Sequence, residues 1–229
     1  IMGDPVSSVA YALEAALRAL NGDLRLLLPT MGLVVGVVAL VAANYHMLIE
    51  RFPEGGGAAA AVGAAFSDPW AFLPIGALIV DFCLTISISI AAATSAIIAD
   101  VSQLSAWRIP LALMLLLIVA GGSCLGHGGR LAFAIMTVLF LGVALVVLVH
   151  GFINPSEGVG PPIVASPGHS PIIAVLLAFP VAMALATGIE APSSAIAQLG
   201  QLDNRGRRFF GQTTLWLTVG IVGVLTLSL

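Results

Sequence analysis

Long runs of apolar residues, broken by very few charges, constrain the fold of this chain more than any other feature. Of its 229 residues, 59% are hydrophobic and 8% are charged, whereas a soluble domain carries about 25% charged residues. A spanning helix needs about 20 mostly apolar residues. The sequence therefore predicts an all-α transmembrane protein. The predicted full spans are Leu26–Ile49, Trp70–Ala99, Trp107–Ser123, Leu131–Phe152, Ile172–Leu199 and Phe209–Leu229.

A polar stretch opens the chain ahead of these spans. Asp4 and Pro5 precede an apolar run that ends at Leu20 and is too short to cross a bilayer. We interpret Pro5–Leu20 as the outer half of a broken helix, which brings the total to about seven spans. The chain starts within helical chemistry and stops without a polar cap, so we expect a piece of a longer protein.

Glycine-rich or polar segments connect the predicted spans. The segment from Phe52 to Phe66 is expected to be a loop or a short interfacial helix. Within the second span, Gly32 and Gly36 have the spacing that allows a close helix–helix contact. The other predicted connections are the turns Gly126–Arg130 and Gln201–Arg208 and the connector Asn154–Pro171.

Three carboxylates, Asp4, Asp81 and Glu190, lie where lipid or helix neighbours are expected. Each costs roughly 2.5–3.5 kcal/mol at the centre of a membrane helix. No Arg or His occupies an equivalent depth, so the positive charge is expected to come from a bound cation, a proton or both. The alternative is that some of these carboxylates belong to loops.

The span that contains Asp81 carries Thr85 and Ser89 at the following turns, so one helix face is polar. These hydroxyls either border a site or donate to carbonyls of their own helix. For Ser89 we favour the bond within the helix. For Thr85 both readings stay open.

A second break is predicted at Thr187–Pro192, where glycine, proline and a carboxylate occur within six residues. Gly188 and Pro192 free backbone groups in mid-span, and freed carbonyls can bind a cation where they line a cavity. A simple proline kink is the alternative. Five spans separate the starts of the two broken helices, so these cross in opposite senses. This pattern favours an inverted-repeat transporter with its site at mid-membrane.

Other residue types point away from metal, redox and enzyme chemistry. The two cysteines are interpreted as small buried hydrophobes, and the four histidines share no ligand spacing. No nucleophile–base pair or phosphate loop is present, so we expect neither an enzyme nor a resident cofactor or metal. The net charge of −3 argues against nucleic-acid binding. The cysteines are Cys83 and Cys124, and the histidines are His46, His127, His150 and His169.

The distribution of arginine between alternate loops predicts the orientation of the chain in a cell membrane. One set of loops contains five arginines and the other contains three. The set with more arginines is therefore predicted to lie in the cytoplasm, and the missing amino terminus is predicted to lie on the same side. The first set is Arg51, Arg130, Arg205, Arg207 and Arg208, and the second is Arg18, Arg25 and Arg108.

Four motifs, in order, resemble the amino acid–polyamine–organocation (APC) superfamily, and most closely its potassium–proton symporter branch, the KimA-type importers. They are Asp4–Tyr11, Phe52–Gly57, Val80–Thr85 and Thr187–Ala191. The resemblance implies a LeuT-like fold of two inverted five-helix repeats. Residues 1–152 would then be the first repeat without the start of its first helix. Residues 172–229 would be the first two helices of the second repeat, within one transmembrane domain.

The resemblance also implies a cation site between the broken first and sixth helices and the third. Its matching residues are Asp4, Tyr11, Asp81, Thr187 and Glu190. At Phe82 the sequence departs from the family, whose potassium importers carry tyrosine there, and this puts potassium selectivity in question.

The sequence therefore predicts a secondary active transporter that imports a monovalent cation, with potassium first, coupled to protons. Glu190 is the candidate proton carrier, because burial favours the neutral form of a carboxyl group. An amino-acid or polyamine permease of the same superfamily is the alternative, and a truncated, non-transporting membrane protein is the second. The expected partners are the lipid bilayer, the cation, the proton and a second copy in a homodimer.

Overall fold

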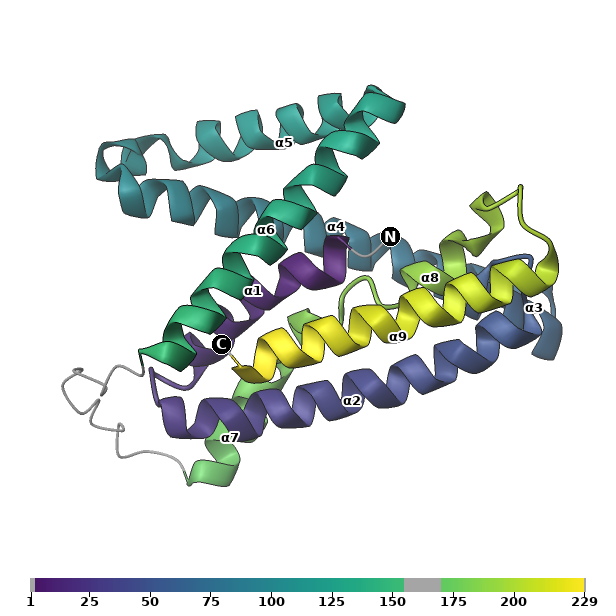
Figure 1. The fold of residues 1–229 in the computed structure, drawn as a ribbon, viewed down its shortest axis with the longest axis horizontal. Helices are drawn as coiled ribbons and strands as arrows, with labels where there is room; N and C mark the ends of the chain where they lie inside the picture. Colours follow the sequence, from purple (N-terminus) through teal and green to yellow (C-terminus); the bar gives the residue numbers. More distant parts are fainter. Residues whose placement is uncertain (1–2, 155–169, 229) are drawn as a thin grey trace.

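The computed structural model describes residues 3–154 and 170–228, with the backbone only at residues 3, 4, 127, 130 and 198. Every regular element in this part of the chain is a helix (Figure 1). The α-helices are α1 (Gly3–Ala19), α2 (Leu24–Arg51), α3 (Gly57–Ala65), α4 (Asp68–Asp100), α5 (Arg108–Cys124), α6 (His127–Ile153), α7 (Pro171–Ala182), α8 (Ala191–Ala195) and α9 (Asn204–Ser228). The 3-10 helices are η1 (Ser102–Trp107), η2 (Met183–Ala186) and η3 (Ile196–Gln198).

Six of these segments are long and apolar enough to cross a membrane, which confirms an all-α transmembrane protein. They coincide with the six predicted full spans to within a few residues. The first run, α1, has 17 residues and is the short helix that the sequence predicts. The six spans are Leu24–Arg51, Asp68–Asp100, Ser102–Cys124, Leu131–Ile153, Pro171–Ala195 and Asn204–Ser228.

Two predicted turns are shorter than expected. Helix α6 begins at His127, because Gly126 alone (φ +58°) supplies the left-handed conformation that the turn requires. Helix α9 begins at Asn204, because the Asp203 carboxylate accepts a 2.8 Å bond from the Gly206 amide and caps the helix. The arginines of the second predicted turn therefore lie in the first turns of α9. Most of the connector Asn154–Pro171 lies outside the described residues.

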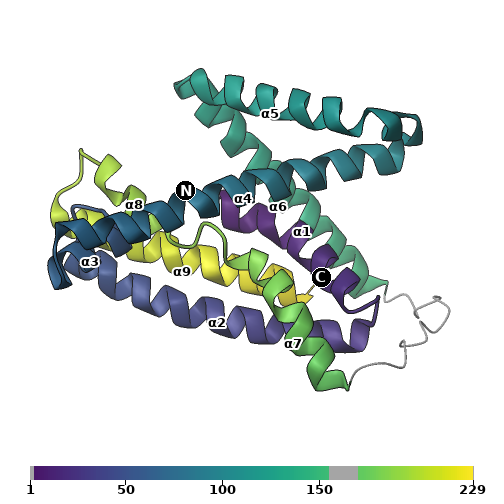
Figure 2. The same ribbon diagram turned by 180° about the vertical axis from the view of Figure 1, so that it is seen from behind.

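The apolar core lies among α1, α2, α7, η2 and α9, and α1 and α2 pack against each other and against the other three. Helices α2 and α9 lie side by side along most of their length in both views (Figures 1 and 2). This part of the molecule is organised by long apolar helices that each bury one face. Its fully buried side chains include Val6 and Val9 of α1, Met31, Val34 and Val38 of α2, Leu185 of η2 and Leu215 of α9.

Glycines on α9, rather than those on α2, allow the closest approach within this core. A Cβ built at Gly32 or Gly36 meets no atom within 4 Å, so the predicted close contact there is wrong. Gly32 lies on an exposed face of α2. On α9, a Cβ at Gly211 would lie 2.7 Å from Ile196 Cδ1 and 3.1 Å from Ile49 Cγ2.

Helices α4, α5 and α6 lie at the periphery. None of the α5 side chains is buried, and the main contacts of α5 are with η1, α4 and α6 (Figure 1). Cys83 on α4 and Cys124 on α5 are both free and exposed, so their prediction as buried residues is wrong. An apolar run shows that a residue lies in a span, but the span can present it either to the core or to the outside.

Candidate functional site

The segment between η2 and α8 is a true break in a spanning helix. Thr187 has extended backbone angles (φ −61°, ψ 134°), and Gly188 has φ +81°, which a residue without a Cβ adopts at little cost. Helix α8 then starts at Ala191, with Pro192 in its first turn, where a missing amide hydrogen does no harm. The predicted break is therefore confirmed, and a simple proline kink is excluded.

Short hydrogen bonds hold both sides of the break. The Thr187 hydroxyl donates to the Ala184 carbonyl at 2.9 Å, closing the end of η2. On the other side, the Glu190 carbonyl accepts bonds from the Ser193 hydroxyl at 2.8 Å and from the Ser194 amide at 3.1 Å. Glu190 is thus fixed directly ahead of α8.

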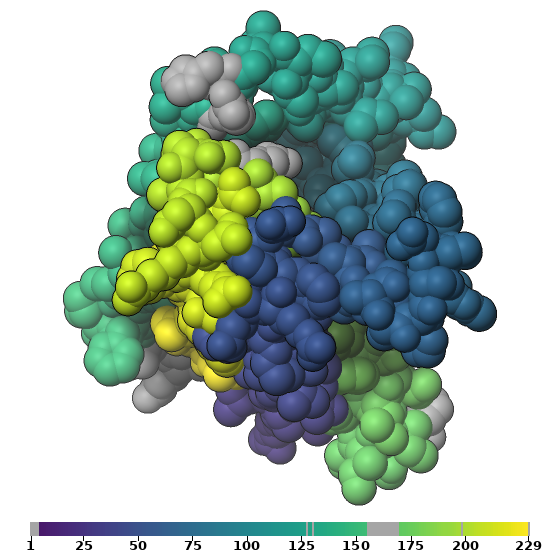
Figure 3. Space-filling view, turned by 90° about the vertical axis from the view of Figure 1, so that its right-hand side faces the viewer, coloured from purple at the N-terminus to yellow at the C-terminus, as the bar shows by residue number. Residues whose placement is uncertain are grey.

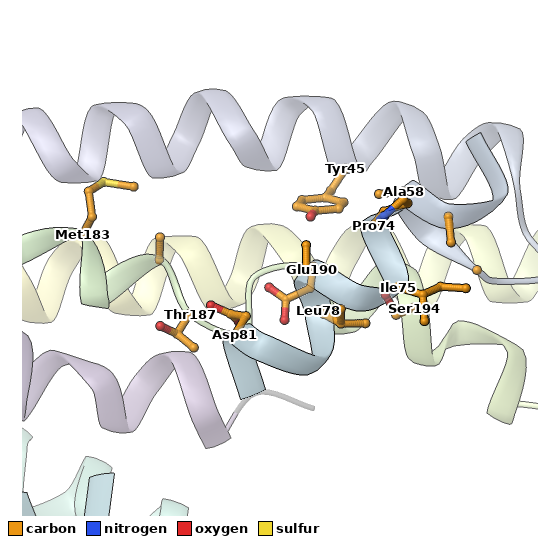
Figure 4. A pocket seen from close by; sticks show the side chains of 14 residues that line it. Tyr45, Ala58, Pro74, Ile75, Leu78, Asp81, Met183, Thr187, Glu190 and Ser194 are labelled. Carbon is orange, nitrogen blue, oxygen red and sulfur yellow. The ribbon is translucent and has the colours of Figure 1, made fainter. Parts of the chain in front are cut away.

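A cavity of about 470 Å³ lies beside this break (Figure 4). Asp81 from α4, together with Thr187 and Glu190 from the break, lines it. Figure 4 shows the two carboxyl groups turned toward the same space, although more than a hundred residues separate them in the sequence. Three of the five predicted site residues are therefore brought together.

Apart from these groups, the cavity lining is mostly apolar and carries no positive charge. None of the described residues that line it is Arg, Lys or His. Half-buried Asp81 and Glu190 give the cavity a strongly negative character, and the Glu190 Oε1 atom is itself buried. Such a lining is suited to a cationic ligand.

The end of the α2–α3 connection and the start of α3 close one end of the cavity. Gly56, Ala58 and Ala59 contribute to the lining, and Gly57, the first residue of α3, packs closely against Ser193 and Ser194 of α8. Figure 3 shows this end of the molecule, where residues near 50–60 (dark blue) lie beside the α8–α9 connection (lime).

The hydroxyl of Thr85 is used within its own helix. Its Oγ1 donates to the Asp81 carbonyl at 2.9 Å, and Thr85 does not line the cavity. This contact decides between the two open readings in favour of the bond within the helix. Phe82 is 40% exposed and is also absent from the cavity lining.

The opening stretch of the chain lies near the break, since α1 packs against η2 and also contacts α4. Tyr11 is half-buried against the core, and its hydroxyl lies 2.6 Å from Ser8 Oγ. Tyr11 does not line the cavity, and its role in the site stays a prediction. The side chain of Asp4 lies outside the described residues.

Tyr45 is a cavity residue that the sequence prediction missed. It comes from α2, near the cytoplasmic end predicted for that span, and its ring enters the cavity from the wall opposite α4 (Figure 4). The available signal was the run Asn44–Tyr45–His46, which places three residues with polar groups in succession inside an apolar helix.

The sequence of this chain is similar to that of a protein of known name. The potassium transporter KimA of Bacillus subtilis (strain 168) is 28% identical to this chain over 211 residues. The aligned part covers 86% of this chain and 34% of KimA, so the chain spans about a third of its relative's length. No protein-family model matches the chain.

The similarity to KimA agrees with the resemblance based on the four motifs. KimA is named as a transporter and not as an enzyme, which supports a membrane transport protein. Membership of the APC superfamily, the inverted repeats and proton coupling stay predictions.

Proposed function

We propose that this chain forms part of a secondary active transporter that imports a monovalent cation and couples this import to protons. Potassium is the leading candidate for the cation. One observation carries the proposal: two carboxylates from distant parts of the chain share a cavity beside a broken spanning helix, and none of the described residues in its lining is positively charged. The similarity to the potassium transporter KimA supports the choice of cargo.

The energetics of the bilayer favour a bound cation in this cavity. A carboxylate at the centre of a spanning helix costs roughly 2.5–3.5 kcal/mol, and two in one cavity repel each other. A cation between them would offset both effects. Oxygen ligands suit an alkali cation, and the break supplies backbone carbonyls in addition to the side chains.

We assign separate roles to the predicted site residues. Asp81, Thr187 and Asp4 would bind or border the cation, with Tyr11 two turns along α1 as a gate or further ligand. Glu190 would carry the proton, since its Oε1 atom is buried and a buried carboxyl group is less costly in its neutral form. The two predicted repeats, residues 1–152 and 172–229, would supply the two sides of this site, in a cell membrane with the amino-terminal side cytoplasmic.

Uptake of a potassium or rubidium tracer into proteoliposomes, with the full-length natural protein, tests this function. Asp81→Asn should lower uptake by about tenfold or more, the equivalent of at least 1.4 kcal/mol of lost cation binding or transport. Glu190→Gln should abolish accumulation driven by a proton gradient but retain potassium–potassium exchange. Asp100→Asn, at the exposed end of the same helix as Asp81, is the matched control and should match the wild type.

Unchanged uptake by both Asp81→Asn and Glu190→Gln would refute the assignment. The negative cavity also suits an ammonium group, which keeps an amine permease as the second candidate. Amino acids are disfavoured, because the two carboxylates would repel an α-carboxylate. Uptake of a labelled polyamine, with no competition by unlabelled potassium, would decide for the permease.

A further inference from the structure

The cavity has a third wall, and α2 supplies its polar group. Tyr45 is half-buried, packs against the apolar core with one side of its ring and lines the cavity with the other. Figure 4 shows it projecting from α2 toward Glu190, with Asp81 beyond. Three elements thus each direct a polar side chain into the same space.

The Tyr45 hydroxyl lies within electrostatic reach of both carboxylates. Figure 4 shows Glu190 between the Tyr45 hydroxyl and Asp81, and all three side chains line the same cavity. A phenol has one proton to donate and lone pairs with which to accept. It can therefore donate to one carboxylate while its oxygen faces a cation held between the walls.

A neutral oxygen at this position fits the charge balance of the cavity. A monovalent cation needs several oxygen ligands to replace its water shell, but it neutralises only one carboxylate. Neutral donors are therefore better suited than a third acid to complete the shell. The Thr187 hydroxyl, whose proton is donated to the Ala184 carbonyl, presents its lone pairs as one such donor, and Tyr45 is placed as another.

We propose that the Tyr45 hydroxyl is a direct cation ligand that determines which monovalent cation the cavity selects, an inference that rests on the proposed function. The rigid ring, held against the core, fixes the distance between this oxygen and the opposite wall. A site of fixed size favours the cation whose dehydrated radius fits it. The competing explanation is that Tyr45 is a packing residue whose hydroxyl makes no contact with the cargo.

Substitution of Tyr45 by phenylalanine separates these explanations, because it removes one oxygen and keeps the ring. The readouts are potassium-dependent thermal stabilisation of the purified full-length protein and rubidium-tracer uptake in competition with sodium, potassium and caesium. For Tyr45→Phe we expect the apparent affinity for potassium to fall about tenfold. The preference for potassium over sodium should narrow by a similar factor, while the maximal rate stays within about twofold.

Thr137→Val is the matched control. It also removes a hydroxyl from a spanning helix, but this hydroxyl donates to the Phe133 carbonyl at 2.9 Å on α6, away from the cavity. It should leave both affinity and selectivity unchanged. Tyr45→Leu, which also removes the ring, should lose selectivity to at least the same extent and also lower the midpoint of thermal unfolding.

Wild-type affinity and selectivity in Tyr45→Phe would overturn the role of Tyr45 while leaving the transport function intact. Failure of the transport function has a different signature. In that case the wild-type protein would show neither potassium-dependent stabilisation nor tracer uptake, and Asp81→Asn would have no effect on either measurement.

Discussion

Three consecutive glycines in the α2–α3 connection have backbone angles that residues with a Cβ rarely adopt. Gly55, Gly56 and Gly57 have φ values of +94°, +88° and +47°. A Cβ at Gly57 would lie 3.0 Å from Ser193 Oγ and 3.1 Å from Ser194 Oγ. The backbone conformation thus favours glycine at this position, where α3 begins beside α8 at the end of the cavity, and a side chain there would press on the two serine hydroxyls.

Gly57→Ala should destabilise the protein. A left-handed backbone costs an L-residue about 1–2 kcal/mol, and the serine hydroxyls of α8 would also have to move. Thermal unfolding in detergent, followed by tryptophan fluorescence, measures the loss. Gly32→Ala is the control, because Gly32 lies within α2 with no atom near the new methyl group, and it should be neutral or stabilising by about 0.5–1 kcal/mol. Equal losses in the two variants would contradict this account.

The residues of the cavity differ in how far the sequence could identify them. Asp81 and Glu190 are conspicuous, because a carboxylate within an apolar run is costly unless it has a function. Tyr45 has no such energetic signature beyond its place in a short polar run, since a tyrosine is equally suited to a core, an interface or a site. Its direction depends on the rotation of α2 relative to α4, which only tertiary packing defines.

Among the helices, sequence signals located the break between η2 and α8 better than the helix ends. Glycine and proline at positions 188 and 192 act locally on the backbone, so the break between η2 and α8 was predictable from the residues themselves. The start of α9 was misplaced, because polar residues were read as a turn although Asp203 caps a helix that begins with them. Polarity marks the end of the membrane core but not the end of a helix.

The contact between the helices α2 and α9 can be tested by a substitution. Gly211 lies where α9 crosses Ile49 of α2 and Ile196 of η3, with no room for a side chain. Gly211→Val should therefore overpack the contact and destabilise the protein by about 1–3 kcal/mol.

Gly220 of the same helix provides the comparison. It is exposed, and a Cβ there meets no atom within 4 Å, so Gly220→Val should change the unfolding midpoint little. Both variants are measured by the same thermal unfolding experiment in detergent. A loss in Gly220→Val as large as that in Gly211→Val would show that the valine acts through helix propensity rather than through packing.

For the whole molecule, the sequence determined the class of fold but not which helices are neighbours. Hydropathy gives the spans, since each apolar run must bury its backbone polar groups in a helix. The pairing of α2 with α9 joins segments more than 150 residues apart, and nothing local in either helix specifies it. The peripheral position of α5 could not be predicted from the sequence either, because its apolar residues resemble those of a core helix.

The outward-facing cysteines test this arrangement. In permeabilised membranes, Cys83 and Cys124 should react with an apolar maleimide but hardly with a charged, membrane-impermeant thiol reagent. The reason is that an apolar reagent can enter the hydrocarbon layer around these helix faces, whereas a charged reagent cannot. After denaturation in detergent, both should react with the charged reagent.

A cysteine at Gly200, which lies in an exposed turn before α9, is the positive control in a background without the two natural cysteines. Gly200→Cys should react with the charged reagent in permeabilised membranes. Rapid labelling of Cys83 or Cys124 by that reagent under the same conditions would show that water reaches these helix faces.

The distance in sequence between the two cavity carboxylates has a consequence for biosynthesis. During synthesis, Asp81 is added to the chain more than a hundred residues before Glu190 is made. Asp81 must therefore enter the bilayer before its later neighbours exist. The strong hydropathy of the rest of α4, which averages 2.2 over its most apolar window, offsets this insertion cost. The long apolar surface of α4 is then as much a requirement of membrane insertion as of the finished fold.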